Sequence, residues 1–206
     1  MRSFASDNNS GVHPAIMEAL TRANQDHALG YGDDSWTKEA VRKIKEIFVA
    51  DCEPLFVFNG TGSNVIALQL LTRPYNSIIC AETAHVYVDE CGSPVKMTGC
   101  QIRPVATPDG KLTPELIAPY LHGFGDQHHS QPGAVYLSEC TELGTIYTPE
   151  ELRAITSLAH QHGMRVHMDG CPRPFTESID RRLRYRCAQF WRNQKRIDDG
   201  RVCDRI

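Results

Sequence analysis

The sequence of 206 residues lacks several features that would place it in a special class of protein. No apolar run approaches the roughly 20 residues that a membrane-spanning helix needs. The polar start, MRSFASDNNSG, lacks the apolar core of a signal peptide. The eight cysteines form neither a CxxC pair nor a recognisable disulfide framework. We therefore expect a cytoplasmic protein with reduced thiols and no membrane partner.

Composition predicts a globular domain followed by an atypical tail. Hydrophobic residues make up 41% of the chain and charged residues 23%, as in ordinary soluble domains. Residues 171–206 hold nine of the sixteen arginines and carry a net charge of +5, whereas the first 170 residues carry −8. A basic tail can indicate a nucleic-acid-binding arm, but here the arginines are interspersed with cysteines and aromatic residues, without a helical or alternating pattern. We expect residues 171–206 to be poorly ordered and not to bind nucleic acid.

Strand and helix signals alternate as far as Gly170. Helices are expected over residues 11–24, 34–48, 65–71, 113–121 and 148–163, and strands over residues 54–58, 77–81, 100–106, 133–140 and 165–169. Pro14 suits the first turn of the first helix, and Ser35 is the expected cap of the second. This alternation predicts an α/β fold, with a mostly parallel sheet and helices on both faces.

A glycine-rich turn follows the first predicted strand. Ligands of parallel sheets bind at the carboxyl ends of the strands, and the stretch NGTGSN occupies such a position at residues 59–64. Glycines and hydroxyls at the start of a helix can hold an anion with backbone N–H groups. The alternative is a plain glycine turn with a Ser/Thr cap. A nucleotide loop is not indicated, because the stretch matches neither GxxxxGK[ST] nor GxGxxG.

Ionisable side chains follow three other predicted strands. His85 comes after residues 77–81, Glu142 after residues 133–140, and Asp169 ends the last strand. A lone histidine is commonly structural, and an acid at a strand end is commonly a cap. A carboxylate there can also hold a protonated ring nitrogen. An anion cradle, a ring-facing imidazole and such a carboxylate together meet the demands of pyridoxal 5′-phosphate (PLP).

A metal site is the alternative for the histidine-rich stretch HGFGDQHHSQ. His122, His128 and His129, with Asp126, are potential ligands. Glycines and polar residues mark this stretch as a surface loop, and adjacent histidines rarely converge on one ion. We expect solvent-exposed loop histidines and no metal site.

Several stretches in a fixed order resemble a known family. FASDNNSGVHPAIMEAL, YGDDSWT, FVFNGTGSNVIALQ, ICAETAHVYVDECG, TPDGKLTPELI, TELGTIYTPEEL and HMDG lie between Phe4 and Gly170. They resemble the low-specificity L-threonine aldolases, which belong to the aromatic-amino-acid β-eliminating lyases with an aspartate-aminotransferase-like fold. The resemblance implies PLP-dependent cleavage of a small amino acid, L-threonine or L-allo-threonine, to glycine and acetaldehyde. It also implies homo-oligomers whose active sites lie at subunit interfaces.

The resemblance assigns roles to four residues of the predicted cofactor site. Gly60 and Thr61 would bind the cofactor phosphate. His85 would stack on the pyridine ring and act as a catalytic residue by assisting movement of the β-hydroxyl proton. Asp169 would pair with the pyridine nitrogen. Residues 1–170 would then be part of a PLP-binding large domain.

The implied substrate contacts are only partly present. Ser6 would lie at the substrate carboxylate, and Tyr31 would lie nearby. After Asp-Gly the family has Ala-Arg, in which the arginine clamps that carboxylate in a bidentate contact. Here Cys171 and Pro172 follow instead, with Arg173 one position late. The resemblance therefore implies weakened orientation of the substrate.

The segment that contains the cofactor-binding lysine of the family is missing in this reading frame. In the family this segment resembles Ser-Phe-Gly-Gly-Thr-Lys-Asn-Gly. The later part of the family's large domain and its small C-terminal domain are also missing from this sequence. The codons of QFWRNQKR, residues 189–196, permit Ser-Phe-Gly-Gly-Thr-Lys-Asn when they are read one nucleotide later. The same shift after Gly170 permits Ala-Arg. We hypothesise that a single-nucleotide insertion near codon 171 displaced the frame and that the chain is catalytically inactive.

Two alternatives keep the tail as a genuine sequence. Lys195 could serve as a relocated cofactor-binding lysine, in which case the chain would retain the chemistry of the family. Alternatively, the chain could be a non-catalytic binding module with a basic tail.

Overall fold

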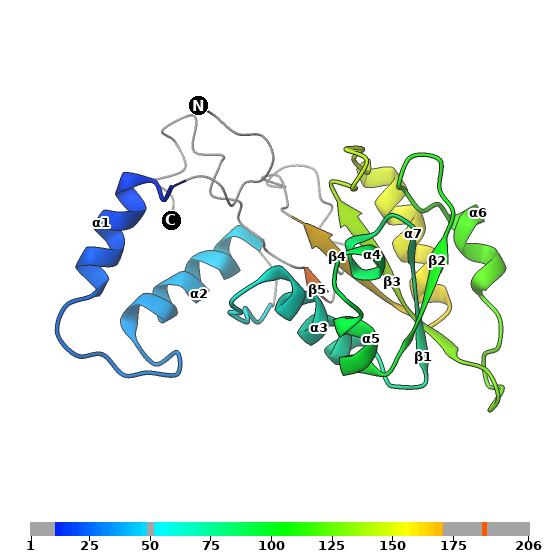
Figure 1. The fold of residues 1–206 in the computed structure, drawn as a ribbon, viewed down its shortest axis with the longest axis horizontal. Coiled ribbons are helices and arrows are strands. Elements are labelled where there is room, and N and C mark those ends of the chain that lie inside the picture. Colours follow the sequence, from blue (N-terminus) through cyan, green and yellow to red (C-terminus); the bar gives the residue numbers. More distant parts are fainter. Residues whose placement is uncertain (1–10, 49–51, 171–186, 189–206) are drawn as a thin grey trace. The chain divides into compact units, whose positions relative to one another are not determined.

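The computed structural model describes residues 11–48, 52–170 and 187–188 (Figure 1). The chain divides into two compact units, one of residues 1–56 and 192–206 and the other of residues 57–191. The predicted tail lies outside the described residues apart from two positions, so the predicted division at residue 170 stays a prediction.

The first unit contributes two helices, α1 (Pro14–Ala23) and α2 (Ser35–Phe48). Pro14 is the first residue of α1, as predicted, at a position where a missing N–H leaves no helical bond unmade. The predicted cap of α2 was wrong by one residue. Asp34 supplies the capping oxygen, because its Oδ1 accepts a hydrogen bond of 2.7 Å from the backbone N–H of Thr37. Its negative charge also suits the positive end of the helix dipole.

The second unit is built on a parallel sheet. Its strands are β1 (Asn76–Ala81), β2 (Gln101–Val105), β3 (Gln131–Glu139), β4 (Arg165–Gly170) and β5 (Cys187–Ala188). They lie in the order β2-β1-β3-β4-β5, and every neighbouring pair is parallel. The predicted parallel α/β sheet is confirmed, and four of its strands lie where the sequence placed them.

One helix of the second unit precedes β1, and the others lie between successive strands of the chain (Figure 1). They are α3 (Gly60–Leu71), α4 (His85–Val88), α5 (Ser93–Thr98), α6 (Pro114–Ile117) with a following 3-10 turn (Ala118–Tyr120), and α7 (Pro149–Gln161). The two short helices α4 and α5, which form the crossover from β1 to β2, were not predicted. Helix α7 starts with a capping box, in which Thr148 and Glu151 each bind the other's backbone N–H.

Two hydrophobic cores lie on opposite faces of the sheet. Side chains alternate between the faces along each strand, and consecutive apolar residues in β1 therefore enter different cores. Ile79 and Val135 pack with Ile155 of α7 in one core. Ile78 packs with Leu68 of α3 in the other. Coverage of both faces explains why these strands read as continuous apolar runs.

The apolar run at residues 54–58 does not form the predicted buried strand. No strand is assigned to it, and its side chains are open to solvent, Leu55 at 59% and Phe58 at 92% of full exposure. A strand needs a hydrogen-bonding neighbour, and none of the described strands pairs with this segment. The prediction failed because apolar composition shows that a segment can be buried and does not show what covers it.

The part of the chain that the structure describes contains both buried and exposed free thiols. Cys80 and Cys100 are buried free thiols, and Cys91 and Cys140 are exposed ones. Burial raises the pKa of Cys80 to about 12, which keeps this thiol protonated and unreactive.

None of the helices in the described ranges is both long and apolar enough to cross a bilayer.

Candidate active site

The order of the strands changes direction at β1. From β1 the chain moves outward to β2 and then returns to the opposite side of β1 as β3. Ligands of such sheets bind at this change of direction, outside the carboxyl ends of the strands. A hydrogen bond links the segments that follow β1 and β3. The backbone N–H of His85, after β1, donates to Oε1 of Glu142, after β3, at 2.8 Å. The Ser138 hydroxyl donates to the same oxygen at 2.7 Å.

Asp169 lies near the carboxyl end of β4, opposite Ser138 of β3. Its Oδ2 accepts a hydrogen bond of 2.9 Å from Asn64 Nδ2 and a short one from the Tyr136 hydroxyl. Burial, and then the Asp169 charge, raise the pKa of Tyr136 well above its ordinary value, so this phenol remains a donor. Two neutral donors therefore orient the carboxylate without neutralising it.

His85 forms a pair with a buried acid. Its Nδ1 lies 3.0 Å from Glu90 Oε1. The His85 side chain is 47% exposed, whereas that of Glu90 is fully buried. Burial raises the pKa of Glu90, although the hydrogen bonds from Asn64 and His85 oppose that rise. One ring nitrogen of His85 is thus held by the protein, while the side chain remains partly exposed to solvent.

The predicted anion cradle is the start of helix α3. Gly60 and Thr61 are its first two residues, and Asn59 caps it by accepting a 2.8 Å hydrogen bond from the Gly62 N–H. A Cβ added to Gly62 would lie 3.1 Å from Asn59 Oδ1, which is tight enough to disturb the cap. The positive end of a twelve-residue helix, with the Thr61 hydroxyl beside it, suits a phosphate.

Helix α3 connects the predicted anion cradle to the ionisable side chains of His85, Glu90 and Asp169. Asn64 lies one turn after Gly60 and bonds both Asp169 and Glu90. One potential ligand atom from each of His85, Glu90 and Asp169 lies within 4.8 Å of the others. A helix start that suits an anion is therefore connected through Asn64 to a close set of imidazole and carboxylate groups. This arrangement fits an aromatic nitrogen heterocycle that carries a phosphate.

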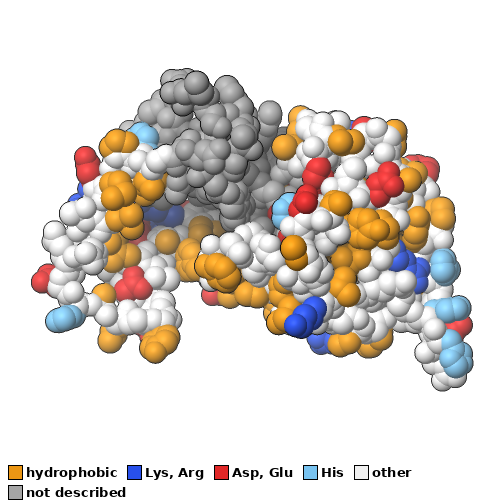
Figure 2. Space-filling view, in the orientation of Figure 1, with side chains coloured by type: hydrophobic (Ala, Val, Ile, Leu, Met, Phe, Trp, Pro, Cys, Tyr) orange, Lys and Arg blue, Asp and Glu red, His pale blue; other side chains and the backbone are white. Residues whose placement is uncertain are grey.

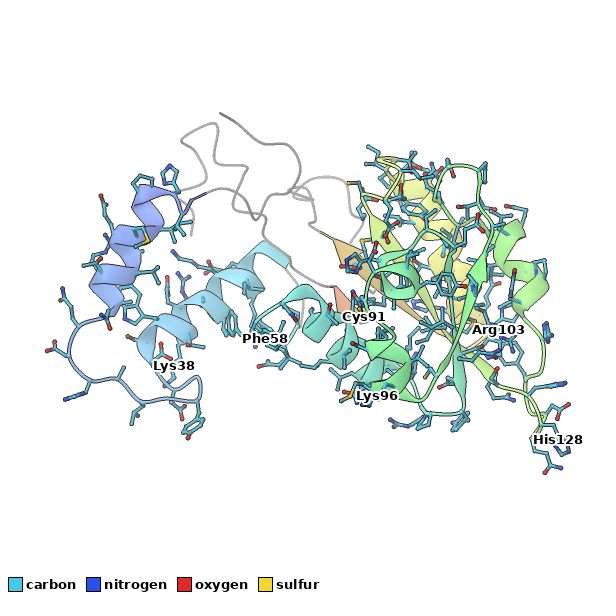
Figure 3. All side chains as sticks on the ribbon, viewed as in Figure 1. Lys38, Phe58, Cys91, Lys96, Arg103 and His128 are labelled. Atoms are coloured by element: carbon cyan, nitrogen blue, oxygen red, sulfur yellow. The ribbon has the colours of Figure 1, made fainter. Side chains whose placement is uncertain are left out.

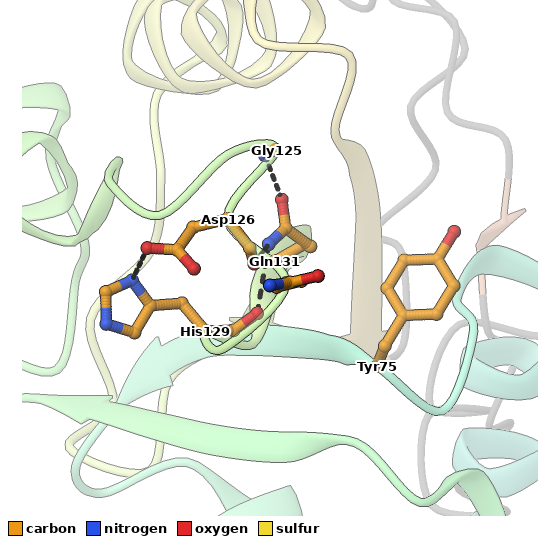
Figure 4. A pocket seen from close by; sticks show the side chains of 6 residues that line it. Tyr75, Gly125, Asp126, His129 and Gln131 are labelled. Carbon is orange, nitrogen blue, oxygen red and sulfur yellow. Dashed lines mark hydrogen bonds and ion pairs between the residues drawn. The ribbon is translucent and has the colours of Figure 1, made fainter.

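Histidines of the loop before β3 make contacts within that loop (Figure 4). His129 Nδ1 lies 3.1 Å from Asp126 Oδ2, and both side chains are largely exposed. Gln131 donates through Nε2 to the backbone carbonyls of Gly123, Asp126 and His129 and so closes the loop. Within the described ranges these histidines do not form a group of three ligands.

The structure places most of the predicted site residues. Gly60, Thr61, His85 and Asp169 all belong to the second unit and are connected as described above. Tyr31 lies in the first unit, where its side chain is fully exposed and its φ of 63° is left-handed. The other predicted substrate contact, at position 6, and the substituted positions 171–173 lie outside the described residues.

Three residues of the site were missed by sequence reasoning, namely Asn64, Glu90 and Tyr136. Asn64 could have been found as a polar residue one turn inside the glycine-rich helix start. Glu90 follows His85 by five residues, across a single short helical turn, which could have suggested a contact. Tyr136 gave no signal, because an aromatic residue within an apolar strand usually belongs to the core.

Comparison with known proteins identifies the family. Residues 3–176 match the family model described as beta-eliminating lyase. The chain belongs to the beta-eliminating lyase family. Members of this family, including the threonine aldolases among them, depend on PLP, the kind of ligand that the site fits.

Several curated relatives of this beta-eliminating lyase chain are threonine aldolases. The low specificity L-threonine aldolase of Pseudomonas aeruginosa is 44% identical over 170 residues, covering 82% of this chain and 49% of that protein. The enzyme of the same name from Pseudomonas sp. is 42% identical over 170 residues, with the same coverage. The chain spans about half the length of the curated relatives it matches.

Solved structures agree with this assignment. The Leishmania major threonine aldolase has a TM-score of 0.78 and 35% identity, with 83% of this chain and 50% of that one covered. A putative L-allo-threonine aldolase from Listeria monocytogenes has a TM-score of 0.63 at 18% identity and supports the fold alone. The beta-eliminating lyase chain thus has the fold of part of a PLP-dependent threonine aldolase large domain.

Proposed function

We propose that the described residues form the cofactor-binding part of a PLP-dependent carbon–carbon lyase, which cleaves L-threonine or L-allo-threonine to glycine and acetaldehyde. The observation that carries this proposal is the connection of the α3 start, His85 and Asp169 through Asn64 at the carboxyl ends of the strands. The 44% identity to an enzyme of that activity supports it.

Each site residue has a definable task in this reaction. When bound, PLP supplies an electron sink for the pair left on Cα as the Cα–Cβ bond breaks. Gly60 and Thr61 hold the phosphate at the positive end of α3. Asp169 keeps a proton at the pyridine nitrogen. His85 would lie against the ring, and with its Nδ1 held by Glu90, its Nε2 would be the atom that accepts the β-hydroxyl proton.

We also propose that this chain binds the cofactor but does not turn over substrate efficiently. Positions 171 and 172 are Cys and Pro where the family has Ala-Arg, and the family's lysine segment is not encoded in this frame. Ser6 and Tyr31 stay predicted substrate contacts.

Binding of pyridoxamine 5′-phosphate to the full chain tests the proposed site. This probe needs no covalent bond to a lysine, so the chain is expected to bind it in a fluorescence or calorimetric titration. Asp169→Asn removes the charge that pairs with the ring nitrogen and should weaken binding about tenfold or more, the worth of a charge-assisted hydrogen bond. Asp126→Asn, in the exposed loop, is the matched control and should bind as the parent does. Failure of the parent chain to bind, or equal affinity in both variants, would contradict the proposal.

We propose further that the chain self-associates, as the family resemblance implies. The second unit exposes many apolar side chains, some of them visible in the space-filling view and, for Phe58, labelled on the ribbon (Figures 2 and 3). They include Phe58, Leu70, Tyr87, Val88 and Met97, each at least 50% exposed. Scattered exposed apolar residues are ordinary, but so many on one unit favour a protein partner, for which a second copy is the simplest identity.

Sedimentation velocity tests this expectation. The parent chain should sediment as a dimer or larger species, and Leu70→Asp on α3 should shift the population toward monomer by placing a charge in an apolar contact. Gln127→Asp, in the exposed loop before β3, should leave the sedimentation unchanged. A monomeric parent chain at micromolar concentration would show the idea to be wrong.

A further inference from the structure

One buried amide connects the two sides of the proposed cofactor site. Asn64 is 1% exposed. Its Nδ2 lies 2.6 Å from Glu90 Oε1 and 2.9 Å from Asp169 Oδ2. Its Oδ1 lies 2.7 Å from His167 Nε2. Every polar atom of this side chain is therefore engaged, and two of its partners are acids that approach from different elements.

The partners determine which way the amide points. Only the amide nitrogen has hydrogens to donate to two carboxylates. Asn64 Oδ1 must then be an acceptor, and the hydrogen it accepts lies on His167 Nε2. His167 is fully buried, and burial lowers its pKa to about 4, so it is neutral and adds no positive charge to the acids. The neutral imidazole thus locks the amide with both N–H groups toward Glu90 and Asp169.

Glu90 extends this chain of hydrogen bonds to His85. The same oxygen, Oε1, accepts from Asn64 Nδ2 and lies 3.0 Å from His85 Nδ1. A continuous path therefore runs from Asp169, which faces the ring nitrogen in the proposed function, through Asn64 and Glu90 to His85, which faces the ring. Its members come from α3, α4, the loop after α4, and β4.

An amide is well suited to the centre of this path. Among the described residues, no lysine or arginine forms an ion pair with Glu90 or Asp169. Two acids this close destabilise each other's charges unless donors compensate them. Asn64 gives one N–H to each and introduces no cation that would compete with a protonated ring for Asp169.

We propose that Asn64 is a positioning residue that orients Asp169 directly and His85 through Glu90, so that the ring-nitrogen acid and the ring-facing imidazole are set by a single side chain. This inference rests on the proposed function for the identity of the ligand. Its consequence for the chemistry is specific. With Nδ1 held as the donor to Glu90, His85 Nε2 is left unprotonated, which is the form that can accept a proton from a β-hydroxyl group.

The test compares variants of the full chain in two measurements. The first is side-chain ¹⁵N NMR of histidine-labelled protein, which reports which nitrogen of His85 carries the hydrogen. The second is the affinity for pyridoxamine 5′-phosphate. Asn64→Leu removes the donors at similar volume, whereas Thr72→Val, a buried polar change at the other end of α3, controls for general loss of stability.

The expected result is a single His85 tautomer, protonated at Nδ1, in the parent chain and in Thr72→Val. Asn64→Leu should show mixed tautomers and bind the probe about tenfold more weakly or worse. A purely structural role would lower the unfolding temperature and leave both readouts of the folded protein unchanged. The proposal would be overturned if folded Asn64→Leu kept the parent's His85 tautomer and bound pyridoxamine 5′-phosphate within about twofold of the parent's affinity.

A second variant keeps the test decisive if Asn64→Leu does not fold. Glu90→Leu has a side chain of similar size, removes the oxygen that accepts from both residues, and so breaks the path between Asn64 and His85. It should release the His85 tautomer while reducing probe affinity less than Asp169→Asn does. A His85 signal identical to that of the parent would again overturn the proposal. The tautomer is read without ligand, so failure of the parent to bind the probe would refute the proposed function and leave this inference separately testable.

Discussion

Removal of one nucleotide near codon 171 is expected to raise the rate of L-allo-threonine cleavage on the order of 10³-fold, the scale of a lost proton-transferring group. The present frame places Cys171 and Pro172 after Gly170, where the family resemblance calls for Ala-Arg. The shifted frame permits that pair and a lysine-containing segment farther on. The arginine would hold the substrate carboxylate in a bidentate contact, and the lysine would bind the cofactor and return a proton to Cα.

The measurement begins with the nucleotide sequence from codon 168 through codon 200 and beyond. We expect the shifted frame to spell both motifs and to stay open. The restored gene is then expressed beside the parent, with a matched control in which the recovered lysine codon is changed to alanine. Activity should appear in the restored protein alone.

If the shifted frame contained a stop codon or encoded neither motif, this expectation would be wrong and the tail would be a genuine sequence. Lys195 would then be the residue to test. Borohydride reduction of the chain under saturating PLP, followed by peptide mapping, would show a covalent adduct at Lys195 if it had taken the role of the family's lysine. Absence of that adduct would exclude the role.

The free energy of unfolding should contain a pH-dependent contribution of about 3 kcal/mol from His167, present at pH 7 and lost by pH 4, since each unit of pKa shift is worth about 1.4 kcal/mol. Burial lowers the pKa of His167 from 6.5 to about 4 in the folded chain. As pH falls below 6.5, the unfolded chain takes up the proton first, and this favours unfolding. The loss is complete once pH falls below the folded pKa. No solvent screening reduces the effect, because the side chain is 0% exposed.

The contribution is best measured as a difference between parent and variant. Glu90 acts in the opposite direction, because its raised pKa means that protonation on acidification favours the folded chain. Urea titrations from pH 7 to pH 4 on the parent and on His167→Gln remove this and other shared effects. The gap in unfolding free energy should change by about 3 kcal/mol over that range, whereas His128→Gln should follow the parent. Parallel curves for the parent and His167→Gln would show that His167 titrates normally.

Much of the fold could be predicted because its signals are local. Helix α7 is marked by Thr148, Glu151 and apolar residues at helical spacing, all within one stretch of sixteen residues in the sequence. The alternation of such helices with short apolar strands requires a parallel sheet. In a parallel sheet the carboxyl ends share one edge, so His85 and Asp169 could be assigned to one site from their positions after strands.

The remaining features depend on contacts between distant parts of the chain. Asn64 bonds Asp169 across 105 residues and Glu90 across 26, and no sequence period connects such positions. The run at residues 54–58 has a strand-like composition, yet composition does not provide the neighbour that a strand needs. A hydrogen bond between remote residues exists only after the backbone has brought them within about 3 Å. The sequence therefore determined the elements and the edge at which the site lies, whereas packing determined which buried amide, acid and imidazole meet there.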